Sequence, residues 1–132
     1  MRIDMSRKFV IGAVCFLAWI GIVFALMLTS HHAVSDGCAT YGPTHRVTIH
    51  NNKVSAQDVT GKRCDRLIIT NDDAITREIA FGAHDDHVPY DGVTERALNK
   101  TQSLTVTLDK TGRYHWHDHL HDEVQGYFSV SN

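Results

Sequence analysis

The segment GRYHWHDHLHDEVQGYFSV, residues 112–130, contains the strongest strand signals in this sequence. Residues 113–119 carry aromatic side chains at alternate positions, and residues 126–130 are rich in aromatic and β-branched side chains. Both patterns are typical of β-strands. We therefore predict two strands here, joined by a short connection.

The alternation within residues 113–119 also predicts which way each side chain points. In a strand, alternate side chains share a face. Tyr114, Trp116 and Asp118 should therefore point one way. Tyrosine and tryptophan suit a core, so we expect the opposite face to be a solvent or interface face. That face carries His115, His117 and His119.

Upstream of this segment, several short runs alternate in the same way or are rich in β-branched residues, and turn residues separate them. The predicted strands are residues 45–50, 54–59, 66–70, 78–81 and 103–108. The long polar stretch 82–100 is expected to be mostly loop, with one helical turn near residues 95–98. Short strands at roughly ten-residue spacing predict an all-β sandwich.

The N-terminus has a different character. Residues 9–28 form an uncharged apolar run, which as a helix would span roughly 30 Å, the thickness of a bilayer core. Positive charges precede it, which places the N-terminus in the cytoplasm and the rest of the chain outside. A cleaved signal peptide is the alternative, but no A-x-A-like site follows Leu28, so we favour an uncleaved single-pass anchor.

These observations divide the 132 residues into four parts. We expect a cytoplasmic N-terminus at 1–8, a transmembrane anchor at 9–28, a linker at 29–44 and one extracytoplasmic domain at 45–132. The formal net charge of −2 and the absence of a basic stripe argue against nucleic acid as a partner.

Cysteine usage agrees with export. Cys38 and Cys64 are the two cysteines beyond the apolar run, and a pair in an oxidising compartment suggests one disulfide. The alternative is that they ligate a metal, because thiolate is a preferred ligand of copper and zinc.

The order of features from 45 to 130 resembles the cupredoxins of the plastocyanin and azurin type. Four segments carry the likeness: residues 67–74, 104–108, 112–114 and 126–130. The resemblance implies a cupredoxin-like Greek-key β-sandwich of about seven strands. It also implies a blue-copper site built from one upstream His and a Cys-x-x-His-x-x-Met motif.

This sequence departs from that motif at three of its four ligand positions. Asp118 stands at the Cys position and Val124 at the Met position, and the upstream His would fall near Arg77. We interpret Arg77 as a surface or ion-pair residue. His121 alone carries over. A trigonal thiolate site cannot form without the cysteine, so electron transfer by that route is not expected.

Histidine offers another route to a metal. The chain has 10 His, four of them between residues 115 and 121, and two more, His84 and His87, in the long loop. Neutral imidazole suits copper, zinc, nickel and iron. The predicted ligands are His84, His87, His117, His119 and His121. Nearby carboxylates should orient the imidazoles, namely Asp85, Asp86 and Asp118.

A second resemblance concerns three residues only. His117-Asp118-His119 is similar to the His-Cys-His of multicopper oxidases, in which the flanking histidines bind copper at a domain interface. This likeness implies an interface site in a homo-oligomer.

Three functions follow from these predictions. The first is capture, buffering or delivery of a transition metal, copper first and zinc as the alternative, with a metal-delivery partner. The second is a small copper oxidoreductase, although the sequence shows no clear substrate pocket and we favour a non-enzymatic role. The third is a metal-free interaction domain. A solvated histidine face or a pH-sensing cluster would also account for the histidines.

Overall fold

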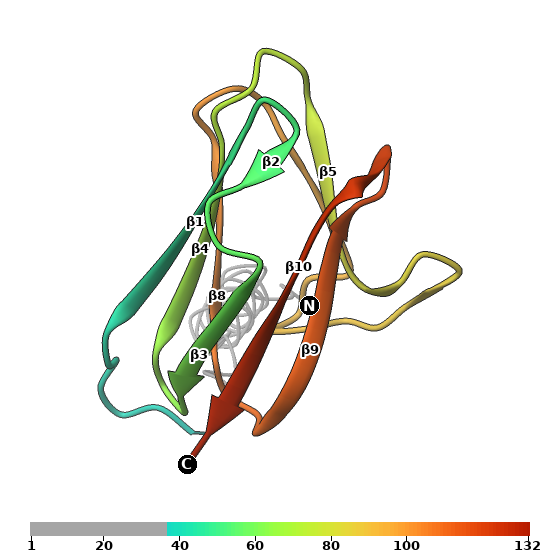
Figure 1. Cartoon of the computed structure of the whole chain (residues 1–132). Helices are drawn as coiled ribbons and strands as arrows, with labels where there is room; N and C mark the ends of the chain where they lie inside the picture. Colours follow the sequence, from blue (N-terminus) through green and yellow to red (C-terminus); the bar gives the residue numbers. More distant parts are fainter. Residues whose placement is uncertain (1–36) are drawn as a thin grey trace, which may run out of the picture. The chain divides into compact units, whose positions relative to one another are not determined.

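Two β-sheets form the part of the chain that this computed structural model describes, residues 37–132 (Figure 1). The first sheet has the strand order β2-β1-β4-β8, with bounds Lys53–Val54, Thr44–His50, Arg66–Asn71 and Ser103–Thr107. The second has the order β3-β10-β9-β5-β6, with bounds Asp58–Lys62, His121–Ser131, Gly112–Asp118, Arg77–Ala83 and Asp86–His87. Strand β7, Glu95–Leu98, pairs with β5 as well.

Two parallel pairings show that the chain passes repeatedly between the sheets. Strand β1 runs parallel to β4, and β10 runs parallel to β3. Parallel neighbours cannot be joined by a tight hairpin, so the intervening chain must cross over. The architecture is therefore an all-β sandwich, as predicted, although residues 37–132 contain ten strands where about seven were expected.

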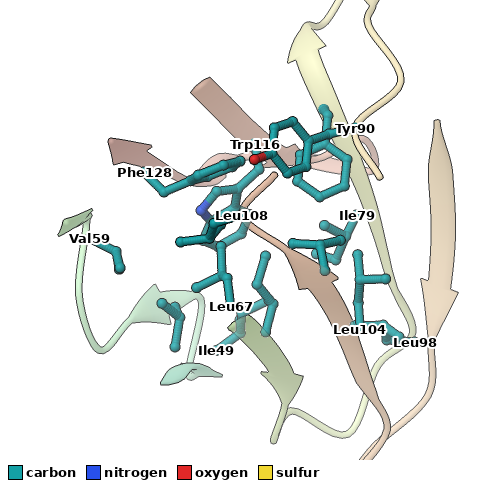
Figure 2. Close-up of a cluster of buried hydrophobic side chains, with 14 of the residues drawn as sticks. Ile49, Val59, Leu67, Ile79, Tyr90, Leu98, Leu104, Leu108, Trp116 and Phe128 are labelled. Atoms are coloured by element: carbon teal, nitrogen blue, oxygen red, sulfur yellow. The ribbon is translucent and has the colours of Figure 1, made fainter. Parts of the chain in front are cut away.

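The core lies between the two sheets and follows the two-residue period of the strands. In β1 and β4 the buried apolar side chains are Val47, Ile49, Leu67 and Ile69. Trp116 of β9 and Phe128 of β10 face them from the second sheet (Figure 2). Full burial of each such side chain contributes about 1.5–3 kcal/mol, so this alternation stabilises the fold.

The predicted strands at 45–50, 66–70, 78–81, 103–108 and 113–119 are confirmed within one or two residues at each end. The segment 54–59 instead divides between β2 and β3. The last strand is longer than predicted, because β10 starts at His121 and contains an irregularity between His121 and Gln125.

The helical turn predicted near residues 95–98 is wrong. These residues form strand β7, which pairs with β5 through four residue pairs, from Arg77↔Leu98 to Ala80↔Glu95. Glu, Arg, Ala and Leu are all good helix formers, but this propensity is a weak influence, and pairing with the β5 backbone overrides it.

The predicted disulfide is present between Cys38 and Cys64, whose Cα atoms are 5.3 Å apart. Neither sulfur is therefore available as a thiolate ligand. The predicted anchor at 9–28 lies outside the described residues. Within residues 37–132 no helix is long and apolar enough to cross a membrane.

Candidate metal centre

Three neighbouring strands place His117 and Glu95 on one face of the second sheet. Ala80 of β5 is paired with His117 of β9 on one side and with Glu95 of β7 on the other. Paired residues in adjacent strands point to the same face. The small Ala80 side chain between them leaves room above the sheet for longer side chains.

A hairpin between β5 and β6 brings two more histidines to this face. Gly82 has φ +91°, and a Cβ at this position would lie 2.5 Å from the Asp86 carbonyl oxygen. Only glycine fits such a backbone easily. Gly82 pairs with His87, and the turn of the hairpin is at His84 and Asp85. The rings of His84 and His87 lie 5.6 Å and 5.3 Å from the His117 ring.

Four histidines form a cluster above β9: His84, His87, His117 and His119. The His84 ring stacks on the His119 ring with centroids 4.6 Å apart. Nδ1 of His119 lies 3.2 Å from Nε2 of His87. Nitrogen atoms of His84, His117 and His119 all lie within 4.8 Å of one another, close enough to share one metal ion.

His117 is the most unusual member of this cluster. It is only 2% exposed, and neither ring nitrogen has a hydrogen-bond partner among residues 37–132. A buried polar group left unpaired costs about 1–3 kcal/mol. Burial lowers the pKa of His117, and the adjacent His115, His87 and His84 lower it further. The ring is therefore neutral at pH 7, with a lone pair free to ligate.

The expectation of a solvent-facing histidine surface is only partly correct. The histidines do point away from the core, but the hairpin covers His117. His115 is occupied otherwise, because its Nδ1 lies 2.8 Å from the Gly82 carbonyl oxygen and its Nε2 lies 2.8 Å from Oε1 of Gln125. With both nitrogens engaged, His115 is not a ligand.

Two carboxylates near the cluster were not predicted from the sequence. Asp122 places Oδ1 2.8 Å from Nδ1 of His84, and Glu95 places Oε2 3.9 Å from Nδ1 of His87. Only the strand register of β7 could have revealed Glu95. The predicted acceptors Asp85 and Asp86 lie in the same hairpin and are exposed.

Asp118, the third predicted acceptor, points to the opposite face of β9, into the interior. It is fully buried and accepts a 3.0 Å hydrogen bond from Nη1 of Arg77. Its other oxygen accepts from the backbone N–H of Glu78 at 2.9 Å and of Leu120 at 3.1 Å. Asp118 therefore does not contact the histidine cluster on the outer face.

Arg77 is the centre of a buried ion-pair network rather than a surface residue. It is 0% exposed and pairs with both Asp118 and Asp73. Burial alone would lower the pKa of Arg77, but hydrogen bonds to the two carboxylates more than offset it and raise the pKa. Burial likewise opposes ionisation of Asp73, yet hydrogen bonds from Arg77 and two backbone N–H groups lower its pKa.

His121 lies on the Asp118 side and not in the cluster of four. Its Nδ1 is 3.2 Å from Oδ2 of Asp118, and His121 is in neither of the donor groups that could hold an ion. The structure thus brings four of the five predicted ligands together and places the fifth beside the buried ion pair.

Comparison with known proteins rests on structure alone. No protein-family model matches the sequence, and no curated protein matches it. Among solved structures, a purple cupredoxin from Nitrosopumilus maritimus aligns over 65% of this chain and 98% of its own, with a TM-score of 0.58 and 17% identity. An oxidized amicyanin variant aligns over 76% and 88%, with a TM-score of 0.56 and 20% identity. The domain is cupredoxin-like.

The sequence resemblance can now be placed on this cupredoxin-like fold. By that resemblance the blue-copper ligand positions correspond to Asp118, His121 and Val124, and the upstream His falls near Arg77. Arg77, Asp118 and Val124 are fully buried, and Arg77 pairs with Asp118 there. Nε of Arg77 and Nδ1 of His121 have no hydrogen-bond partner among residues 37–132. The histidine cluster lies on the other face of the same two strands.

Proposed function

We propose that this domain binds a copper ion through His84, His117 and His119, on the outer side of a membrane to which residues 9–28 anchor it. The observation that carries the proposal is the pair of unpartnered nitrogens on the buried His117, surrounded by other imidazoles. An ion ligated there would satisfy a ring that otherwise costs stability.

The chemistry of the donors favours copper. Imidazole nitrogen binds copper well in either oxidation state, and His117 is neutral at physiological pH. Amicyanins with the same fold include reduced Cu(I) forms. Asp122, at 2.8 Å from His84, supplies the carboxylate that typically orients a ligating imidazole.

The site suits capture, buffering or delivery better than electron transfer. No thiolate is available among residues 37–132, because Cys38 and Cys64 are joined. The His84 side chain is 45% exposed and belongs to a surface hairpin. A ligand at the surface lets an ion enter and leave by ligand exchange with a partner protein.

Anaerobic titration of the full-length protein with Cu(I), in competition with a chromogenic chelator, tests this function. We expect one tightly bound ion. We expect His117→Ala to weaken its binding at least about 100-fold, because even the loss of a group that hydrogen-bonds to a ligand typically lowers metal affinity about 10–100-fold. His50→Ala is the matched control, since His50 is exposed and pairs only with Asp72 in this part of the chain.

Four results would contradict the proposal. Binding weaker than about 10 µM would indicate a metal-free interaction domain. An equal loss of Cu(I) affinity in the His117→Ala and His50→Ala proteins would contradict the assignment of the site. Tighter binding of Zn(II) than of either copper ion would identify a different metal, and oxidase turnover by the loaded protein would favour an enzyme.

A further inference from the structure

His119 belongs to two donor groups at once. One group is His84, His117 and His119, and the other is His87, Glu95 and His119. In each group the potential ligand atoms all lie within 4.8 Å of one another. An imidazole has two ring nitrogens, so one ring can ligate two ions, one on each side, once its N–H proton is released to solvent and the ring is an imidazolate.

The distances among His87, Glu95 and His119 are suitable for binding a separate ion. Nδ1 of His119 and Nε2 of His87 are 3.2 Å apart. Two nitrogens bound at roughly 2.0–2.1 Å around a tetrahedral ion are about 3.3 Å apart. Glu95 lies 3.9 Å from the other nitrogen of His87, beyond hydrogen-bond range, so His87 does not engage this carboxylate.

The sheet separates the two groups laterally. Glu95 and His117 flank Ala80 on either side, so they are two strands apart, roughly 9–10 Å across the sheet. Each group also has its own negative charge: Asp122 contacts His84 in the first, and Glu95 lies beside His87 in the second. Two carboxylates reduce the repulsion between two nearby cations.

We propose that His87, Glu95 and His119 hold a second ion, Cu(II), and that His119 bridges it to the ion of the three-histidine position. The inference rests on the proposed function and extends it from one copper ion to two. A carboxylate is a harder ligand than imidazole and suits the divalent ion, whereas Cu(I) prefers the histidine-only position. The protein should therefore bind one Cu(I) but two Cu(II).

The test is the number of Cu(II) ions retained by the full-length protein after gel filtration, measured by elemental analysis. We expect two ions in the unmodified protein and one in Glu95→Gln. His117→Ala should also retain one ion, the one at the second position. Glu123→Gln is the matched control, because it removes the same charge from an exposed residue that contacts Asn52, and it should retain two.

Each alternative outcome overturns the second position. A single Cu(II) in the unmodified protein, lost on His87→Ala but kept in Glu95→Gln, would make His87 a fourth ligand of one ion. Two ions in both the unmodified and the Glu95→Gln protein would place the second elsewhere. In either case tight Cu(I) binding would survive, so failure here is distinct from failure of the proposed function.

Discussion

At the scale of single residues, β9 separates two kinds of chemistry by the direction of its side chains. Asp118 points inward to Arg77, whereas His117 and His119 point outward to the β5–β6 hairpin. The interior side of this strand end therefore carries a buried ion pair. Among residues 37–132, both groups of residues that could hold a metal ion include His119 on the outer face.

The buried ion pair makes a strong prediction about stability. Arg77→Met should lower the free energy of unfolding by about 3–5 kcal/mol, because Asp118 and Asp73 would stay buried without a cation. Urea denaturation followed by circular dichroism measures the change. If the variant does not fold, the milder Asp118→Asn should also lower the free energy of unfolding.

The matched control for Arg77 is Arg113→Met. Arg113 pairs with Asp58 at 2.6 Å, but both side chains are more than half exposed, so the loss should stay within about 1 kcal/mol. Similar losses in the two arginine variants would contradict a special role for the buried network.

A third carboxylate, Asp65, contributes to the dependence of folding stability on pH. It accepts hydrogen bonds from Nε2 of His45 at 2.8 Å and from the Lys62 N–H at 2.9 Å. The hydrogen bond with His45 is the largest influence that lowers the pKa of Asp65 below 3.8. A lowered folded-state pKa stabilises the protein above 3.8, and this contribution disappears as pH falls through the folded value.

We therefore expect Asp65→Asn to lower the urea midpoint at pH 6 and to reduce its fall between pH 4 and pH 2. The measurement is a series of urea denaturation curves across this range. Parallel curves for the variant and the unmodified protein would show that Asp65 does not contribute to acid unfolding.

At the scale of elements, the β9–β10 ladder carries core residues on one face and His117 of the histidine cluster on the other. Gly126 of β10 pairs with Trp116 of β9, and a Cβ on Gly126 would lie 2.8 Å from Nε1 of Trp116. Trp116 is fully buried and cannot move aside. Its ring therefore requires glycine at the opposite position.

Gly126→Ala should destabilise the domain by about 1–3 kcal/mol through this overlap. Gly37→Ala is the comparison, since its nearest atom is Nη2 of Arg63 at 3.5 Å and its effect should stay within about 0.5 kcal/mol. Thermal unfolding of both variants distinguishes them, and equal melting temperatures would refute the steric argument.

At the scale of the whole domain, the disulfide connects the segment before β1 to the turn between β3 and β4. Cys38 and Cys64 are 26 residues apart, so the bond restricts a long loop of the unfolded chain. The chain-entropy estimate for such a loop is about 3.5 kcal/mol.

Replacing both cysteines with serine should remove about 3.5 kcal/mol of stability and leave Cu(I) affinity unchanged. Denaturation and chelator competition on the same variant separate the two effects. A large loss of copper affinity in the folded variant would mean that the cysteines contribute to the site.

Much of the fold could be predicted because strand signals are local. The alternation of Val47 and Ile49, or of Leu67 and Ile69, is visible in the sequence, and so is the Cys38–Cys64 pair. Strand β7 could not be predicted, because its residues adopt that structure only when β5 lies beside them. The site was also predicted only in part. The histidines stand out in the sequence, whereas Glu95 looks like an ordinary surface residue, and only the pairing of β7 with β5 brings it near His87.

By itself, the sequence determined the class of the domain and the kind of donors it offers, since hydrophobic period and residue type are properties of short segments. Its resemblance to the cupredoxins also argued against a blue-copper site, because Asp118 stands at the position of the cysteine. Only the tertiary structure decided which histidines meet. His117 and His119 join His84 and His87 through the hairpin, and His121 joins Asp118 instead. Successive strand residues face opposite sides of a sheet, so the register and the hairpin decide which histidines form the cluster.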